Sequence, residues 1–129
     1  MNDNKELLVR ESPTVRPDWE ANDCTVLALS NAKGIPYEEA HAILKAHGRK
    51  DRNGPMIADW SRAVRSAGLQ MEPAFSSITL GRFLREHPGG RWVLHVSGHA
   101  FAVVDGKVVD HLGYDHKPGK HIKMAYRVV

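Results

Sequence analysis

The chain has 129 residues, of which 42% are hydrophobic and 26% charged, and its formal net charge at pH 7 is +3. A chain of this length and composition fits one domain with its own hydrophobic core, so we expect a single domain over residues 1–129. Because the chain has only one cysteine, an internal disulfide and a cysteine-rich zinc site are both excluded. A reducing compartment is the natural setting for such a chain.

The sequence also bears on membranes and nucleic acids. It contains no run of about 18 apolar residues, and no apolar signal core follows its polar first residues, so we expect a cytoplasmic protein without membrane association. Its basic side chains form two groups without the interleaved aromatic residues that stack on single-stranded nucleic acid. We therefore interpret both groups as solvated surface and do not expect a nucleic-acid partner. The groups are Lys45, Arg49, Lys50 and Arg52, and Lys117, Lys120, Lys123 and Arg127.

An extended segment and a helix are predicted first along the chain. Residues 1–16 show no clear period, and two nearby prolines disfavour a helix, so we predict an extended N-terminal arm. Asn22 or Asp23 is a suitable N-cap for a helix over 24–33. Consecutive apolar residues at 26–29 face all sides of that helix, which indicates that it is central and buried.

Three further helices and a short strand are predicted before residue 90. Pro36 suits the first turn of the second helix, and Gly48 follows it as a terminator. The third helix, over 56–67, has the clearest apolar stripe at helical spacing. A short strand is predicted over 69–75, and the fourth helix is predicted to start near Thr79.

The period of the sequence changes after residue 90, where four strands are predicted. Asp105-Gly106, a dipeptide typical of two-residue hairpin turns, joins the second of these strands to the third. Helices followed by strands indicate an α+β fold, in which the cysteine-bearing helix packs on a C-terminal antiparallel sheet. The predicted strands are 92–96, 100–104, 107–110 and 122–129.

Cys24 is a candidate nucleophile because of its position at the start of the central helix. Unpaired backbone N–H groups and the helix dipole at this end stabilise a thiolate. The alternative is that this lone cysteine is a small hydrophobic residue, buried and inert. Because a core cysteine does not need a helix start, we favour the nucleophile.

The predicted hairpin supplies a base and an orienting acid. With a two-residue turn at Asp105-Gly106, counting outward along both strands puts His99 and Asp110 diagonally on one face, about 7–8 Å apart at their Cα atoms. His99 would then accept the proton of the Cys24 thiol. Asp110 would orient the imidazole and stabilise its positive charge.

An oxyanion formed at the thiol needs hydrogen-bond donors. The backbone N–H of Cys24 is the natural one, and Asn22 is the only side-chain amide close to it in sequence. His95 is the alternative base to His99, although Ser97-Gly98 is expected to bend or bulge the chain between these two histidines.

A metal site is a further alternative. His111, His116 and His121 could bind a metal ion together with Asp110 or Asp115. Because their spacing fits no tight template, we expect no metal and no other cofactor.

The order of these motifs resembles that of the papain-like cysteine peptidases, in particular the compact C39-like peptidases and the small papain-fold proteins of bacteriophage and bacterial genomes. The resemblance covers roughly residues 18–110 and implies a papain-like α+β fold without a cofactor. It implies Cys24 as nucleophile, His99 as base and Asp110 as orienting acid. The motifs that carry it are Asn22-Asp23-Cys24, Gly98-His99-Ala100, Asp105-Gly106 and Asp110.

One position departs from the family pattern. Papain-like enzymes commonly have an oxyanion-hole glutamine six residues before the cysteine, and this chain has Asp18 there. A carboxylate would repel an oxyanion, so either Asn22 or the backbone replaces the glutamine, or the activity is weak, specialised or lost.

We therefore expect a cysteine peptidase that cleaves a peptide or isopeptide-type bond of a protein or peptide substrate through the Cys24, His99 and Asp110 triad and a thioester intermediate. The rival hypothesis is a catalytically inactive papain-fold binding protein, phage-encoded and directed at a host protein or nucleic acid. The rival predicts binding that survives the substitution Cys24→Ser.

Overall fold

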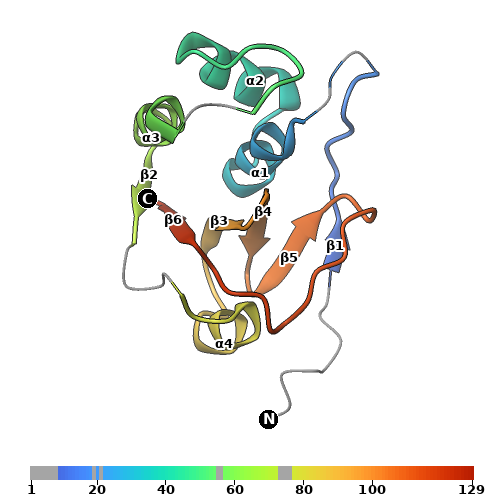
Figure 1. Cartoon of the computed structure of the whole chain (residues 1–129), viewed down its shortest axis with the longest axis vertical. Coiled ribbons are helices and arrows are strands. Elements are labelled where there is room, and N and C mark those ends of the chain that lie inside the picture. The colour runs from blue at the N-terminus through green and yellow to red at the C-terminus, as the bar shows by residue number, and fades with distance from the viewer. Residues whose placement is uncertain (1–8, 19, 21, 55–56, 73–76) are drawn as a thin grey trace.

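The computed structural model of the chain describes residues 9–18, 20, 22–54, 57–72 and 77–129. Four helices and a six-stranded mixed sheet make up its α+β fold (Figure 1). The helices lie close to their predicted positions and the predicted fold class, α+β, is confirmed. They are α1 (Cys24–Lys33), α2 (Tyr37–Ala46), α3 (Ile57–Ser66) and α4 (Leu80–Glu86).

The sheet has the strand order β1-β5-β4-β3-β6-β2. All neighbouring pairs are antiparallel except β1 and β5, which are parallel. The prediction of an antiparallel sheet is therefore wrong at this edge, where residues 9–11 of the predicted arm add a strand. The strands are β1 (Val9–Glu11), β2 (Leu69–Met71), β3 (Arg91–Val96), β4 (His99–Val104), β5 (Lys107–Asp110) and β6 (Met124–Val128).

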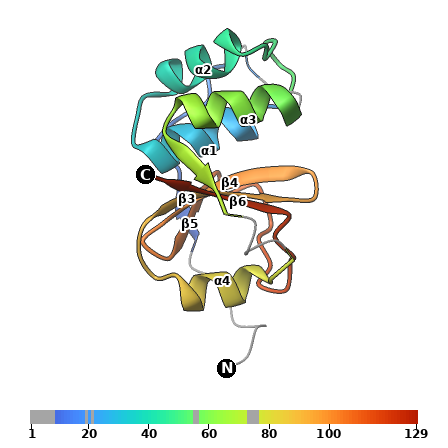
Figure 2. The ribbon, with the colours of Figure 1, turned by 90° about the vertical axis from the view of Figure 1, so that its left-hand side faces the viewer.

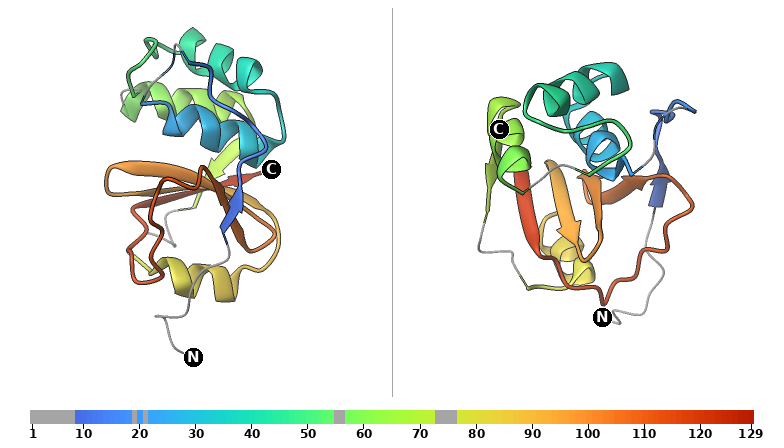
Figure 3. Two further views of the ribbon diagram at one scale, coloured as in Figure 1. Left: turned by 90° about the vertical axis from the view of Figure 1, so that its right-hand side faces the viewer. Right: turned by 45° about the horizontal axis from the view of Figure 1, so that its top comes forward.

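The sheet separates two hydrophobic layers. Helices α1, α2 and α3 lie on one face, and α4 lies alone on the other (Figure 2; Figure 3). Helix α1 is the central one, with eight buried residues out of ten, as its uninterrupted apolar run predicts. On the opposite face, Leu80 and Phe83 of α4 pack against strand residues such as Leu94 and Phe101. Apolar side chains thus cover both faces of the central strands.

Two tight hairpins set the register of the central strands. Asp105 and Gly106 form the predicted turn, with positive φ angles of 50° and 79°, and Val104 pairs with Lys107 as the two-residue turn requires. Ser97 and Gly98 form a second two-residue turn, because Val96 pairs with His99. The expected bend or bulge at Ser97-Gly98 is therefore a hairpin turn, with Gly98 at φ 76°.

No helix in the part of the chain that the structure describes is long and apolar enough to cross a membrane.

Candidate active site

Cys24 is the first residue of α1, and its side chain is only partly buried against the core. The Asp23 carbonyl oxygen accepts a hydrogen bond from the Leu27 N–H at 3.0 Å, but the Asp23 carboxylate does not cap the helix. That buried carboxylate instead accepts a 2.9 Å hydrogen bond from the Tyr37 hydroxyl, and Arg16 lies 3.5 Å from its other oxygen. The Asp23 carboxylate thus leaves the first N–H groups of α1, beside the thiol, uncapped.

His99 connects the thiol to the sheet. It is the first residue of β4, so its ring lies at the end of a strand and makes a hydrogen-bonding contact with Cys24 as well as with Asp110. The distance from His99 Nε2 to Asp110 Oδ2 is 2.7 Å. Tyr114 stacks on the same ring, with centroids 3.8 Å apart and planes 12° apart. The ring is thereby held from several sides, and its side chain is only 8% exposed.

Asp110, the last residue of β5, accepts hydrogen bonds at both oxygens. Its Oδ2 lies 2.7 Å from His99 Nε2 and 2.8 Å from His116 Nε2, and its Oδ1 accepts from the His111 backbone N–H at 2.9 Å. The Asp110 residue is only 2% exposed. The structure therefore brings the predicted His99 and Asp110 together as the hairpin register requires, and it adds a second histidine on the same oxygen.

The charges of this cluster follow from its contacts. Burial, the largest single influence, raises the pKa of Asp110, but hydrogen bonds from His116 and His99 outweigh it and lower that pKa to about 2. Burial likewise lowers the pKa of His99, while its contacts with Asp110 and Cys24 outweigh burial and raise that pKa to about 9. An ionised carboxylate only accepts hydrogen bonds, so both rings must donate from Nε2. The nitrogen that His99 can offer to the thiol is therefore Nδ1.

His95, the alternative base, is placed differently. Its neighbour in the ladder is Ala100, so its ring lies on the opposite sheet face from that of His99. It packs against Trp60 and Tyr126, with ring centroids 4.9 Å and 5.4 Å away. Burial, and to a smaller degree His99, lowers the pKa of His95 to about 4, which keeps the ring neutral near pH 7.

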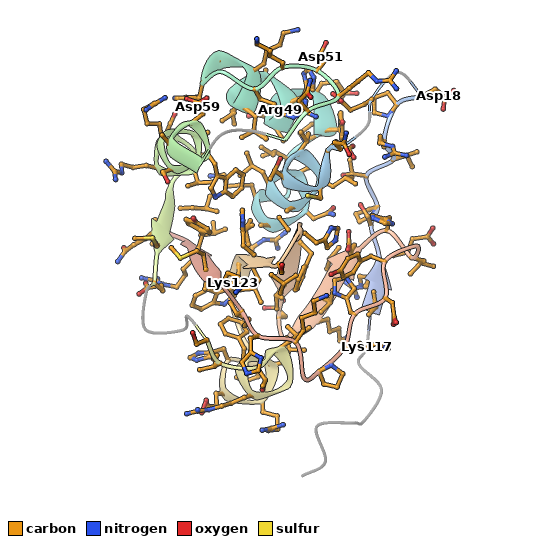
Figure 4. The ribbon with its side chains drawn as sticks, in the orientation of Figure 1. Asp18, Arg49, Asp51, Asp59, Lys117 and Lys123 are labelled. Atoms are coloured by element: carbon orange, nitrogen blue, oxygen red, sulfur yellow. The ribbon has the colours of Figure 1, made fainter. Side chains whose placement is uncertain are left out.

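Neither Asn22, the candidate oxyanion donor, nor Asp18, which takes the position of the family's glutamine, is directed at the thiol. Asn22 is exposed with φ at 50°, and its Nδ2 donates to the Arg52 carbonyl oxygen at 3.0 Å. Asp18 is exposed on the outer side of the loop before α1 (Figure 4). The structure thus brings together Cys24, His99 and Asp110, but engages Asn22 with the backbone of another loop. The donors that remain at the thiol are the backbone N–H groups at the start of α1.

Only part of the alternative metal site gathers around Asp110, namely His111 and His116, whereas Asp115 and His121 lie on the surface. His116 donates to Asp110, Asp115 forms a surface ion pair with Lys117 at 2.8 Å, and His121 is exposed beside Thr79. Side-chain atoms of His99, Asp110 and His111 do lie within 4.8 Å of one another. Both oxygens of Asp110 already accept N–H donors, however, so a cation there would have to displace these hydrogen bonds. The donor set fits a proton-handling cluster better than a metal site.

A second buried charge cluster lies beside the segment that leads into α1. The Arg49 guanidinium donates to both oxygens of Glu20, at 2.9 Å and 3.0 Å, and both side chains are fully buried. His41 Nε2 lies 3.2 Å from Glu20 and 3.1 Å from Asp51. Arg49 and Asp51 are labelled in Figure 4. The interpretation of the first basic group as solvated surface is therefore wrong for Arg49. The burial of Arg49 could not be predicted from the sequence, because an arginine is rarely buried unless it is paired. Its partner, Glu20, lies 29 residues away.

A surface depression lies on the side of α1 and of the loop after β5, and it is lined by neighbours of the site rather than by Cys24 or His99 themselves. It has a volume of 340 Å³ and includes Leu27, one turn after Cys24, together with His111, which follows Asp110. Two strongly exposed apolar side chains, Val15 at 83% and Leu112 at 63%, also line it. The depression reaches the site only through Leu27 and His111.

Comparisons of the chain with protein-family models, with curated proteins and with solved structures gave no match. Its function must therefore be inferred from the site itself.

Sequence reasoning did not find two of the groups around His99. Tyr114 and His116 both lie in the polar loop between β5 and β6, which has no periodic pattern that would place its side chains. The sequence suggests His116 only as one of several possible metal ligands together with Asp110 or Asp115. No local signal indicates that it shares the oxygen that orients His99.

Proposed function

We propose that this protein is a thiol hydrolase of papain-like design that cleaves a peptide or isopeptide-type bond, with Cys24 as nucleophile, His99 as base and Asp110 as orienting acid. The observation that carries the proposal is the double contact of His99, with the Cys24 thiol on one side and the ionised Asp110 on the other. An inert core cysteine requires neither contact. The partial exposure of Cys24 at a helix start is also typical of reactive thiols.

The papain-like part of the proposal is supported by how the elements meet. A buried helix carries the thiol at its N-terminus, and adjacent antiparallel strands of the sheet beneath it carry the histidine and the carboxylate. The same arrangement is implied by the resemblance of the motifs to those of papain-like peptidases.

The proposed reaction proceeds in two steps. His99 Nδ1 takes the thiol proton, and the Cys24 thiolate attacks the carbonyl carbon to form a C–S bond. The imidazolium returns this proton to the departing amine as the C–N bond breaks, which leaves a thioester on Cys24. In the second step His99 removes a proton from water, the resulting hydroxide attacks the thioester, and the proton passes to the leaving thiolate.

Two neighbouring features support this sequence of steps. The Nε2–H hydrogen bond to Asp110 fixes the tautomer in which Nδ1 is the base and stabilises the imidazolium. The uncapped N–H groups at the start of α1 can donate to the oxyanion. Asp23, although adjacent in sequence, has its carboxylate turned toward Tyr37 and Arg16.

The depression that reaches from Leu27 to His111 supports a peptide as substrate. Its exposed apolar residues, Val15 and Leu112, offer contact area to apolar side chains, and its polar backbone and hydroxyl groups suit an extended chain.

An activated ester tests the proposal without knowledge of the natural substrate. The wild-type protein should react with p-nitrophenyl acetate and release nitrophenolate in a burst equal to the protein concentration, and mass spectrometry should find the acetyl group on Cys24. Both Cys24→Ser and His99→Ala should lose this burst. His121→Ala is a matched control, because His121 is an exposed histidine outside the cluster, and it should behave like the wild type. Acetylation that is as fast without His99 would contradict the proposal.

The engagement of Asn22 with Arg52 favours one rival, a protein that keeps this fold but binds without catalysis, because no side-chain amide then supports the oxyanion. The rival is a binding protein directed at a host protein or nucleic acid. Under this rival hypothesis, the wild-type protein would give no burst and no acetyl-Cys24. A burst that depends on His99 would exclude it.

A further inference from the structure

We propose that His116 is a positioning residue of the site: through its hydrogen bond to Asp110 it fixes the carboxylate that in turn orients His99. The loop between β5 and β6 is then part of the active site. This inference rests on the proposed function.

The geometry singles out His116 among the histidines of this loop. Its side chain is 1% exposed, and its Nε2 lies 2.8 Å from Asp110 Oδ2, the oxygen that also contacts His99. His111, in contrast, is exposed and contributes only its backbone N–H to Asp110. A buried imidazole whose N–H points at the functional oxygen is more than a space-filling side chain.

Neighbouring rings hold His116 in this orientation. Phe101 of β4 contacts its ring edge to face with centroids 4.5 Å apart, and the Tyr114 centroid lies 4.7 Å away. Tyr114 also stacks on His99, so the same loop fixes the base directly and, through Asp110, indirectly. His99 and His116 have ring centroids 5.9 Å apart and meet at the one carboxylate.

The charges around His116 explain why the hydrogen bond matters. Asp110 and His99 face it from the strands, His111 lies across the same carboxylate, and the exposed Asp115 precedes it. A buried carboxylate is stable as an anion only when its oxygens accept enough donors. Asp110 has three N–H donors, and loss of the one from His116 would make its protonation easier and leave its plane free to turn.

The role can be separated from packing by two substitutions. His116→Gln keeps an N–H donor near the position of Nε2, whereas His116→Leu fills similar space without one. The readout is the rate of Cys24 alkylation by iodoacetamide as a function of pH, measured on the full chain, with circular dichroism as a check of folding. We expect His116→Leu to raise the acid midpoint of this profile by about one pH unit, because an Asp110 that is held less firmly stabilises the His99 imidazolium, and with it the Cys24 thiolate, less well. We expect His116→Gln to stay close to the wild type.

Two controls make the result specific. His121→Leu, an exposed position outside the cluster, should leave the profile unchanged. If His116→Leu does not fold, long-range proton–nitrogen NMR spectra of the wild type decide the matter, because the proposal requires the hydrogen on Nε2 of His116. A spectrum with the hydrogen on Nδ1 instead would overturn it.

The outcomes also separate this inference from the proposed function. A wild-type profile that depends on His99, together with a folded His116→Leu variant whose acid midpoint is unmoved, would refute the positioning role alone. An equal shift in His116→Gln and His116→Leu would refute it as well, because the donor would not matter. A wild-type thiol that reacts like free cysteine and independently of His99 would refute the proposed function, and the positioning role with it.

Discussion

Two buried carboxylates of this protein, Glu20 and Asp110, each contact a histidine, yet their surroundings differ in the way that separates a structural site from a chemical one. Glu20 is bound by both nitrogens of the Arg49 fork. Asp110 is bound by two imidazoles and one backbone N–H. A guanidinium stays charged at any physiological pH, whereas imidazoles gain and lose protons near neutrality.

The second difference between Glu20 and Asp110 is in the groups to which their partners connect them. The Glu20 cluster joins the loop after α2 to the segment before α1, since Glu20 also accepts a 2.6 Å hydrogen bond from the Arg52 backbone N–H. Nothing in that cluster is a nucleophile. Asp110 contacts His99, which contacts the only thiol in the chain. We therefore interpret the Glu20 cluster as a clamp, which holds the loop after α2 to the segment before α1, and we propose the Asp110 cluster as the reacting site.

The largest expected effect is on acyl transfer. Asp110→Asn should slow the p-nitrophenyl acetate burst by about 100-fold to 10,000-fold, because the amide neither stabilises the imidazolium nor enforces the tautomer with Nδ1 as base. Glu20→Gln, a matched change in the other cluster, should leave the burst rate of the folded protein within a few-fold of the wild type. Equal losses in the two variants, measured by stopped-flow absorbance, would contradict the division of roles.

The next largest effect is on stability, and here the Glu20 cluster should matter more than the Asp110 cluster. Arg49→Met should lower the free energy of unfolding by about 3–5 kcal/mol, because it leaves the Glu20 carboxylate buried without its partner. The double variant Glu20→Gln/Arg49→Met should recover part of this loss. Urea unfolding measures both.

Lys45→Met is the control for the arginine prediction. Lys45 also contacts a carboxylate of this region, Asp51, but at 3.5 Å and with both side chains about half exposed. Its loss should change stability by less than about 1 kcal/mol. A similar cost for Arg49→Met and Lys45→Met would show that the buried pair does not hold the loop.

These two clusters also show what the sequence could predict. The cysteine helix and the Asp105-Gly106 hairpin follow from local signals, an uninterrupted apolar run and a turn dipeptide, and the hairpin register then fixes His99 beside Asp110. Local signals of this kind act between residues close in sequence, so they are readable without a structure.

Three features that could not be predicted from the sequence depend on contacts between residues far apart in the chain. The parallel pairing of β1 with β5, the burial of Arg49 on Glu20, and the hydrogen bond from Asn22 to Arg52 all join parts of the chain 29 or more residues apart. At Ser97-Gly98 the sequence does not distinguish a tight turn from a bend or bulge, because a single glycine favours either. A loop without period likewise gave no sign that His116 reaches Asp110.

A smaller effect is expected on the pH dependence of the free energy of unfolding, which should differ between the Asp110 cluster and the Glu20 cluster. The pKa of His99 is raised from 6.5 to about 9 in the folded protein. Its contribution to stability is therefore complete below pH 6.5 and is lost as the pH rises through 9. The stability difference between the wild type and Asp110→Asn should shrink over this range, by about 1 kcal/mol allowing for solvent screening.

The corresponding difference for Arg49→Met should stay flat over the same range, because the guanidinium does not titrate there. Urea unfolding at a series of pH values from 6 to about 9.5 measures both differences. If the Asp110→Asn difference instead grew with pH, the folded protein would not stabilise the charged form of His99.

The smallest expected effect concerns Asn22, which lies between Glu20 and Cys24 in sequence and is held by the clamp rather than by the reacting site. Its amide donates to the Arg52 carbonyl, in the loop that also contacts Glu20. Removal of this amide should therefore change the p-nitrophenyl acetate burst rate by less than about threefold. Loss of a true oxyanion donor would instead slow it by about 100-fold or more.

The backbone at Asn22 decides which variant to use. Its φ of 50° is in the left-handed region, where alanine is strained and glycine is not, so Asn22→Gly removes the amide without this penalty. A burst that is unchanged in Asn22→Gly would leave the N–H groups at the start of α1 as the oxyanion donors, because Asp18 is an exposed carboxylate without a hydrogen to donate. A loss of about 100-fold in Asn22→Gly would mean that the amide leaves Arg52 and turns to the thiol when substrate binds, which would make the clamp a part of the reacting site.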